Sequence, residues 1–493
     1  MGTERTGVRT TRVPAGVAAG HPATVEAGLR VLAEGGSAVD AAVAATLASC
    51  AAETILCGLG GGGYATVFSA TSGAVTVLDF FCAMPGLAGD VAGPMVPIEI
   101  DFGGVPIPYS IGGASVGVPG IAAGCAELHR RFGRLPWVEI VQPAYDIAHH
   151  GTPIPDPQAA ALRTISAAMT LDQGAAAYAP GGRLLSGGDQ LLHPGLDDAF
   201  ALLASGYAEY AAYTTPLMVE AVQAGGGAMS RLDVDSYRVI SRPVRAATMA
   251  GRHVCGRVDL NRTLPTISAL PPLERLPRPA RAVATARALR DNAHRPDGHG
   301  ETTNISAVDA AGNACVITHT LGLGSGVWLP GLGVHLNSML GEGELLSGHL
   351  MAGDRVNSMM CPLVVLTPSG TLDLAVGSAG ASRIRSALLS TLVAHLVEGR
   401  SVPDAVASPR LHVAGDIAHL EPGYPEDAAA ALAEDGFIVQ QWEQTNHYFG
   451  GVSAVGRSGA AGDPRRGGHA HVLDADFRPD HVYGADLGPR SAP

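Results

Sequence analysis

The sequence predicts a layered α/β fold, and three observations support this prediction. Helical patterns dominate from His21 to about residue 250. After Thr302 the pattern changes to alternating apolar and polar residues with two hairpin signals. The chain has 493 residues and is 46% hydrophobic, which suits two or three domains or one large layered core. We therefore expect a sheet-rich part packed beside helices.

The first expected elements are two helices and a strand. A helix follows His21, over the segment "ATVEAGLRVLAEGG", and the glycine pair at its end stops it. Ser37 caps a second helix, with Asp40 three residues later as its capping-box partner. The segment "AVTVLDFF" (74–81) has its apolar residues spaced for a half-buried strand.

The middle of the chain is expected to be mostly helical. The pattern is helical over 117–154, and helical with Gly and Pro breaks over about 155–250. Residues 265–300 include one helix between Pro- and Gly-rich ends. The segment 265–301 is therefore the best candidate for an exposed linker.

The part after Thr302 carries the strongest strand signals. The segments "TNISAVD" and "ACVITHT" flank a turn at 309–313, which is a hairpin pattern. A second hairpin is expected around 368–370, and the helical segment "SRIRSALLSTLVAHLVEG" follows it.

Composition excludes several classes of function. All 32 basic residues of the Lys+Arg count are arginines, which rules out Schiff-base chemistry, a Ser-Lys dyad and a P-loop. The net charge of −13 argues against a nucleic-acid partner. No apolar run is long enough for a bilayer, and the N-terminus shows no secretory signal. We expect a soluble, cytoplasmic protein with no membrane partner.

The cysteines and histidines show no metal-binding pattern. The 7 cysteines are scattered and lack a CxxC, which indicates buried thiols in a reducing compartment. His149 and His150 are adjacent and so point apart, and no HExxH occurs. His319 and His335 are expected to be hydrogen-bonded structural residues. We expect neither a metal nor a cofactor.

The stretch "GETTNIS" (300–306) admits two interpretations. It is either a loop that enters a strand, or a point where the chain is cut so that Thr302 becomes a new N-terminus. A threonine hydroxyl needs a base within hydrogen-bond reach, and the α-amine of an N-terminal threonine, with an unperturbed pKa of about 8, supplies one. Gly298 and Gly300 would permit the strained turn of self-cleavage.

Other candidate groups also have a structural and a chemical interpretation. In "VGSAGASRIRSALL", Gly380 and Ala381 precede a helix. Their backbone N–H groups are placed to stabilise an oxyanion, or the segment is only the start of a helix. Asp40, Glu53 and Asp79 are candidate acids, but each is unpaired in the sequence, as solvated acids are.

Several segments together resemble one family, the γ-glutamyltranspeptidases of the N-terminal-nucleophile hydrolase superfamily. "HPATVEAGLRVLAEGGSAVDAAVAA" with "GLGGGGYATVF" resembles its N-terminal signature, and "GVPGIAAGCAELHRRFGRLPW" resembles its next block. "TTNISAVDAAGNACVITHTL" resembles the segment that begins at the catalytic threonine. "GVHLNS", "GSAGASRIRSALL" and "GDPRR" follow in the expected order, so the resemblance covers nearly the whole chain.

The resemblance implies a four-layer αββα sandwich formed by a precursor that cuts itself. The cleavage site would be the bond between Glu301 and Thr302. The products would be a large chain (1–301) and a small chain (302–493), interleaved in one compact unit.

The resemblance also assigns catalytic positions. The nucleophile is Thr302, and a second threonine positions it. Two backbone N–H groups form an oxyanion hole, one of them on an alanine whose methyl group narrows it. By position these further residues are Thr320, Gly380 and Ala381.

The substrate pocket departs from the family's pattern at six positions. An aromatic ring replaces the arginine that grips an α-carboxylate, and a ring cannot form that charge-assisted pair. Each lost partner of a charged substrate costs about 1.5–3 kcal/mol. The positions are Phe81 for the arginine, Gly322 for an asparagine, Met339 for a glutamine, Glu342 for the acid that binds the α-amine, and Ser358 with Met359 for two serines.

The expected function is that of an autoprocessing threonine hydrolase or acyltransferase with a small-molecule acyl or amide substrate other than glutathione. A second interpretation, also from resemblance, is a C–C bond hydrolase that releases an oxalyl unit in the biosynthesis of 4-alkylproline antibiotic precursors. Arg383 or Arg385 is then the candidate partner of the oxalyl group. A third interpretation is an uncleaved binding protein that keeps the fold.

Overall fold

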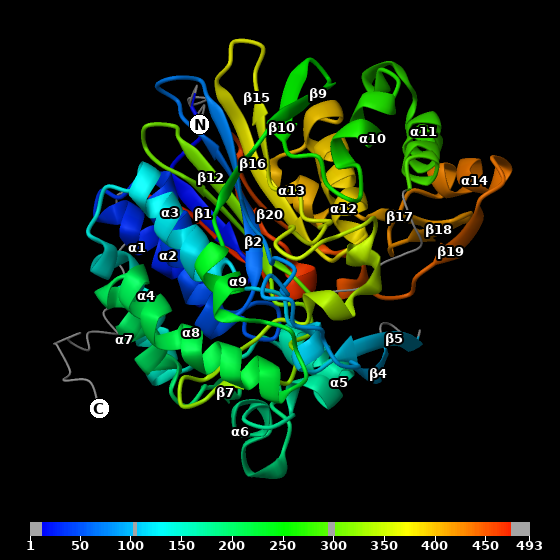
Figure 1. Cartoon of the computed structure of the whole chain (residues 1–493). Helices are drawn as coiled ribbons and strands as arrows, with labels where there is room; N and C mark the ends of the chain where they lie inside the picture. Colours follow the sequence, from blue (N-terminus) through cyan, green and yellow to red (C-terminus); the bar gives the residue numbers. More distant parts are fainter. Residues whose placement is uncertain (1–11, 102–105, 294–300, 475–493) are drawn as a thin grey trace.

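The computed structural model describes residues 12–101, 106–293 and 301–474, and two antiparallel sheets lie at its centre (Figure 1). One sheet has seven strands in the order β22 (His469–Val472), β1 (Gly16–Ala19), β11 (Thr303–Val308), β12 (Ala314–Thr320), β2 (Gly62–Phe68), β3 (Val75–Phe80) and β8 (Ile240–Arg242). The other has six, in the order β21 (Gly459–Gly462), β20 (Gly451–Gly456), β16 (Leu372–Ala379), β15 (Leu363–Leu366), β10 (Arg252–Gly256) and β9 (Arg245–Met249).

The two sheets pack face to face. Strands β11 and β12 contact β16, and β1 and β11 contact β20. Hydrogen bonds cross the interface: Ser306 Oγ donates to the Ser453 carbonyl at 2.8 Å, and Thr66 Oγ1 donates to the Pro362 carbonyl at 2.8 Å. Every residue of β11, β12, β15 and β16 is buried. The central strands therefore lie inside the protein on both faces.

Helices cover the outer face of each sheet, so the architecture is the four-layer αββα sandwich that the family resemblance implied (Figure 1). Helix α2 packs on β11 and β12, and α12 packs on β16 and β20. The layer on the seven-stranded sheet contains α1 (Pro22–Ala33), α2 (Ala38–Ala52), α3 (Ile121–Phe132), α4 (Trp137–His150), α7 (Leu196–Ser205) and α8 (Tyr207–Ala224). The other layer contains α10 (Thr263–Ala269), α11 (Arg278–Asp291), α12 (Arg383–Leu392), α13 (Val402–Ala407) and α14 (Glu426–Glu434).

Further helices and strands lie outside these four layers. The helices are α5 (Asp156–Met169), α6 (Gly174–Tyr178) and α9 (Arg231–Ser236). The strands form small separate sheets: β4 (Val96–Asp101) with β5 (Pro106–Ile111), β6 (Thr152–Pro153) with β7 (Gln190–Leu191), β13 (Trp328–Leu329) with β14 (Val334–His335), and β17 (Leu411–Ala414) with β18 (Ile417–Leu420) and β19 (Ile438–Gln441). Within the described ranges, no helix has both the length and the apolar character needed to cross a membrane.

Local sequence explains the first two helices. The ring of His21 accepts a hydrogen bond from the Ala23 N–H at 3.1 Å and so caps α1. Ser37 and Asp40 form the expected capping box at the start of α2. Residues Ala38–Ala52 are all buried, because small side chains let α2 lie between the sheet and the outer helices α1 and α4.

Most expected elements are present, and one expectation needs correction. The strand near 74–81, both hairpins and the helix after Ser382 are observed. The segment 265–301, however, is not an exposed linker where it is described. Helix α11 packs against α14, and its Ala286 and Leu289 are buried. Its apolar face is short and interrupted by arginines, so the sequence pattern did not predict that this helix packs against another one. Residues 294–300 lie outside the described part.

A buried ion-pair network anchors the segment before β22. The Asp463 carboxylate pairs with the guanidinium groups of Arg410 and Arg465, and it accepts a hydrogen bond from the Val452 N–H at 2.8 Å. Arg465 also pairs with Glu421. Arg410 is 1% exposed, so its charge depends on these partners.

Replacing this buried acid should destabilise the fold. Asp463→Asn leaves Arg410 buried without its carboxylate, so we expect a loss of about 3 kcal/mol in the free energy of unfolding. Urea unfolding followed by circular dichroism measures the loss. The matched control is Asp427→Asn, because Asp427 pairs with Arg278 at the exposed surface, and there we expect little change. Equal losses of stability for the two substitutions would contradict the proposed contribution of the buried network to the free energy of unfolding.

Candidate active site

The hairpin of β11 and β12 brings the two key threonines together. Thr303 pairs with His319 across the hairpin, so the next residues outward, Thr302 and Thr320, come opposite each other. The Thr320 hydroxyl donates a hydrogen bond to the carbonyl oxygen of Glu301, and it accepts one from the Gly322 N–H at 2.8 Å. The carbonyl group that precedes Thr302 is thus held by the second threonine.

A small cavity opens beside Thr302, and we call it the Thr302 cavity. Its empty volume is about 290 Å³, which includes the space at its mouth. Nine residues that the sequence singled out lie in its wall together with three apolar neighbours. The lining residues are Phe81, Glu301, Thr302, Thr320, Met339, Glu342, Leu345, Ser358, Met359, Met360, Ala381 and Ile384.

The two remaining sequence candidates are glycines that sit just behind the wall. Gly322 has φ 70°, in the left-handed region that favours glycine, and a Cβ atom there would lie 2.5 Å from the Met339 methyl group. Gly380 has φ 121°, and a Cβ atom there would lie 2.9 Å from the Cα of Gly450. Both glycines therefore allow close packing around the Thr302 cavity.

The turn before α12 has an uncommon backbone. Ala381 has φ 49°, in the left-handed region that alanine rarely adopts. The Asn261 amide donates to the Ala381 carbonyl at 3.0 Å and helps to hold the turn. Such strain persists only where surrounding contacts enforce it, and here it occurs at a residue that lines the Thr302 cavity.

The wall opposite the threonines is mainly apolar. Phe81 is 1% exposed and packs against Tyr64, with ring centroids 5.6 Å apart. Met339 and Met359 are buried beside it. Among the described residues, the ionisable side chains that line the cavity are those of Glu301 and Glu342. The cavity thus carries no described cation in its wall.

Glu342 lies at the polar edge of the cavity. The Tyr109 hydroxyl donates to Glu342 Oε1 at 3.1 Å and also contacts the Ser338 hydroxyl at 2.8 Å. Desolvation, helped by the nearby carboxylate of Glu344, raises the pKa of Glu342 to about 8. The carboxyl group of Glu342 is therefore largely protonated at neutral pH.

Arg466 is a site residue that the sequence reasoning missed. Its guanidinium group pairs with the Glu301 carboxylate at 2.6 Å, and it also donates to the His447 carbonyl at 3.3 Å. Both partners of the pair are buried. The block "GDPRR" was noticed as a family segment, but nothing in the local pattern connects it with residue 301.

The two arginines suggested as partners of an oxalyl group lie elsewhere. Arg383 stacks over the ring of Tyr448 at 4.2 Å. Arg385 donates to the Leu289 carbonyl at 2.7 Å, toward α11. Neither lines the Thr302 cavity. Sequence proximity to Gly380 was a poor guide because α12 turns both side chains away from the cavity.

Glu53 backs the hairpin from the helical side. Its carboxylate accepts hydrogen bonds from Thr303 Oγ1 at 2.6 Å and from Thr24 Oγ1 at 2.7 Å. Desolvation raises its pKa to about 7, while the two hydroxyl groups oppose the shift. The other candidate acids serve elsewhere: Asp40 caps α2, and Asp79 pairs with Arg242 at 2.7 Å.

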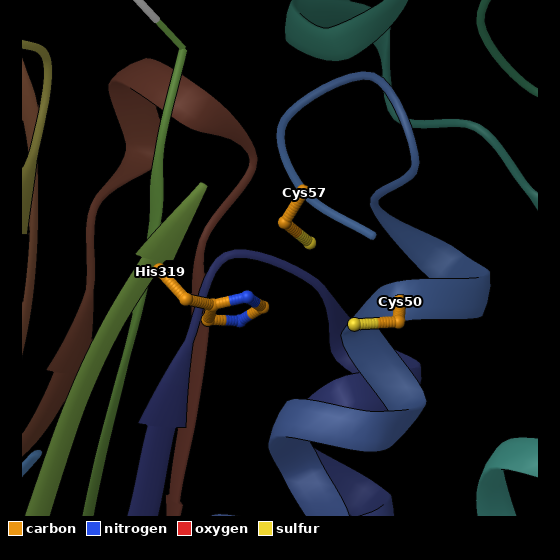
Figure 2. A group of neighbouring side chains, drawn as sticks. All are labelled: Cys50, Cys57 and His319. Atoms are coloured by element: carbon orange, nitrogen blue, oxygen red, sulfur yellow. The ribbon is translucent and has the colours of Figure 1, made fainter. Parts of the chain in front are cut away.

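A buried cluster of Cys50, Cys57 and His319 lies near Glu53 (Figure 2). The three side chains point toward one another, and their possible ligand atoms lie within 4.8 Å. Hydrogen bonds already occupy this space: Ser49 Oγ lies 3.0 Å from His319 Nε2, and the Cys57 thiol donates to the Ser49 carbonyl at 3.4 Å. Burial lowers the pKa of His319 to about 3 and raises that of Cys57. We interpret the cluster as neutral packing of α2 against β12.

Several other predicted roles can be placed. His335 accepts a hydrogen bond from the Gly326 N–H at 2.9 Å and stacks on Trp328, as a structural histidine would. All seven cysteines are free and buried.

Comparison with known proteins identifies the family of this chain. The family model "Gamma-glutamyltranspeptidase" matches residues 24–269 and 265–473. The Acylase ACY 1 proenzyme of Pseudomonas sp. (strain V22) is 26% identical over 506 residues, covering 89% of each chain. The glutathione hydrolase proenzyme of Bacillus subtilis (strain 168) is 24% identical, covering 90% of each chain.

A solved structure supports the fold. The crystal structure of cephalosporin acylase from Bacillus halodurans superposes with a TM-score of 0.77 at 21% identity, covering 96% of this chain and 98% of that one. Taken with the family match, this shows that the chain belongs to the γ-glutamyltranspeptidase family of N-terminal-nucleophile hydrolases and transferases.

Proposed function

We propose that the chain is a precursor that cuts itself between Glu301 and Thr302 and then works as a threonine acylase through an acyl-enzyme on Thr302. The observation that carries this proposal is the hydrogen bond from the Thr320 hydroxyl to the Glu301 carbonyl, beside Thr302 in one cavity. The proenzyme names of the relatives are consistent with it.

The proposed self-cleavage needs only groups of this chain and one water molecule. The Thr302 hydroxyl oxygen attacks the Glu301 carbonyl carbon. The hydrogen bond from Thr320 stabilises the negative charge that develops on the Glu301 carbonyl oxygen. The C–N bond breaks as the hydroxyl proton passes to the nitrogen, which leaves an ester on Thr302 Oγ and a free α-amine. Water then hydrolyses the ester, so Glu301 becomes a chain end and Thr302 recovers its hydroxyl group.

Turnover of an external substrate would repeat the same exchange. The α-amine of Thr302, with an unperturbed pKa of about 8, takes the hydroxyl proton as the oxygen attacks the acyl carbon. The N–H groups at Gly380 and Ala381 are the proposed oxyanion donors, and the strained turn at Ala381 would fix them before the reaction. The leaving amine receives the proton, and water releases the acyl group.

The wall of the Thr302 cavity favours an uncharged acyl group. Phe81, Met339 and Met359 line the cavity. By the family resemblance they stand where polar side chains would bind a charged amino-acid head group, and each missing polar partner would cost about 1.5–3 kcal/mol. The protonated Glu342 offers a hydrogen-bond donor instead of a negative charge. We therefore propose a mainly apolar acyl group with an acceptor atom within reach of Glu342. The oxalyl alternative lacks its expected cation, since Arg383 and Arg385 lie outside the wall.

The first prediction concerns self-cleavage. The purified protein should run as two fragments of residues 1–301 and 302–493 on a denaturing gel, with masses that place the break before Thr302. Thr302→Ala should stay uncut, because it lacks the attacking oxygen. Intact mass spectrometry of both proteins decides the matter. An uncut wild-type chain would contradict this proposal and would favour a binding protein that keeps the family's fold.

The second prediction concerns the acyl group. Hydrolysis of short neutral acyl p-nitroanilides should exceed that of γ-glutamyl p-nitroanilide by at least about 100-fold in kcat/KM, because several charged contacts are missing. Phe81→Arg should reduce this ratio by adding a cation to the cavity, whereas Phe81→Leu, the matched control, should preserve it. A wild-type preference for γ-glutamyl would refute the proposed substrate class.

The third prediction concerns Glu342 and pH. The folded protein keeps the Glu342 proton up to pH about 8, whereas the unfolded chain releases it near the ordinary value of 4.5. The stability contributed by this group is therefore complete below pH about 4.5 and is lost as the pH rises through about 8. Relative to Glu342→Gln, the wild type should thus lose stability across this window. Urea unfolding of both proteins at several pH values tests this, and parallel curves would contradict it.

A further inference from the structure

Glu53 joins three segments on the face of the hairpin that lies away from the Thr302 cavity. It is the C-cap residue of α2. Its two oxygens accept hydrogen bonds from the hydroxyl groups of Thr24 on α1 and Thr303 at the start of β11. Gly20 makes room for it: a Cβ atom on Gly20 would lie 2.2 Å from Glu53 Oε2 and 2.8 Å from Thr303 Oγ1. Side chains alternate along a strand, so Thr303 faces this carboxyl group while Thr302 faces the cavity.

No fixed positive charge balances this carboxyl group among the described groups that shift its pKa. The titratable side chain that interacts with it is that of Cys57, which belongs to the cluster with Cys50 and His319, and His21 lies next to Gly20 in the chain. Burial raises the pKa of Cys57, and it lowers the pKa of His21 to about 4 and that of His319 to about 3. All three are neutral near pH 7. The charge of Glu53 therefore rests on the two threonine hydroxyl groups.

The protonation state of Glu53 decides how Thr303 is held. An ionised carboxylate accepts from both hydroxyl groups at once, as the distances of 2.6 Å and 2.7 Å indicate. When the carboxyl group is protonated, the oxygen that carries the proton is a weaker acceptor, so one of the two hydrogen bonds weakens. Thr303 is covalently joined to Thr302, and a change there reaches the bond that is cut.

We propose that Glu53 is a positioning residue whose ionised carboxylate fixes Thr303, and through it the peptide groups on both sides of Thr302, in the arrangement that self-cleavage uses. This inference rests on the proposed function. It adds a dependence on the charge of a group that touches neither the scissile bond nor the substrate. The pKa of about 7 puts this charge change near neutrality.

The test follows self-cleavage of freshly synthesised precursor, since this readout needs no substrate. Precursor made by cell-free translation is transferred into buffers from about pH 5.5 to about pH 9, a range that brackets the expected transition. Denaturing gels then give the cleavage rate. The wild-type rate should fall as the pH drops through about 7, the pKa of Glu53. Glu53→Gln should remove this transition and keep the rate low.

The threonine variants separate charge from simple structural damage. Thr303→Val removes the hydroxyl group through which Glu53 is proposed to act, so it should remove the transition and keep the rate low, as Glu53→Gln does. Thr303→Ser keeps the hydroxyl group and should restore the wild-type profile. Thr24→Val leaves β11 unaltered and removes the other hydrogen bond that lowers the pKa of Glu53, so the transition should remain and move upward by about one pH unit.

The outcomes distinguish this inference from the function on which it rests. A wild-type precursor that never cleaves at any pH overturns the proposed function itself. Cleavage with the same transition in wild type, Thr303→Val and Thr24→Val overturns only the role of Glu53. If Glu53→Gln slows cleavage by the same factor at every pH and keeps the wild-type transition, the proposal is also overturned, since that result marks a merely structural contact. Gel filtration and circular dichroism confirm folding, and Thr24→Val decides the matter if Glu53→Gln does not fold.

Discussion

The pairing of β11 with β12 is the constraint on which the site depends. A single register, with Thr303 opposite His319, places the threonines at 302 and 320 side by side at the end of the hairpin. A shift by one residue would turn both toward the helices. The register is held by burial on both faces, with the second sheet on one side and α2 on the other. The layered architecture is therefore what makes the two-threonine arrangement possible.

Polar groups are distributed unequally around this hairpin. On the cavity side, the Glu301 carbonyl and carboxylate are each matched, by Thr320 and Arg466. On the helical side, Glu53 has hydroxyl partners only. Farther along the cavity wall, apolar side chains take over around Phe81 and Met339. The protein thus keeps strong polar contacts at the bond next to Thr302 and offers few to whatever occupies the rest of the cavity.

The sequence was informative where the signal is local. Ser37 and Asp40 predicted a capping box, and the turn at 309–313 predicted a hairpin. Both predictions were possible because these features depend on residues a few positions apart. The gathering of Phe81, Met339 and Met359 around Thr302 came from family resemblance, since no periodic pattern links such distant segments. The pairing of Arg466 with Glu301 spans 165 positions and was missed for that reason. Arg383 and Arg385 show the opposite error, in which closeness along the chain did not bring side chains into the cavity.

The strand order of the larger sheet has a consequence for how the protein assembles. Strand β1 lies between β22 and β11, and β12 lies against β2, so segments from before and after residue 301 alternate across the sheet. After the proposed cut at Glu301–Thr302, the two pieces would share one core and could not part without unfolding it. The proposed cut would therefore follow folding. If the cut protein were denatured, its recovery would require two chains to meet in solution, and its yield would depend on concentration. One broken peptide bond would thus mean that the fold, first reached by one continuous chain, could not be reached again in that way after unfolding.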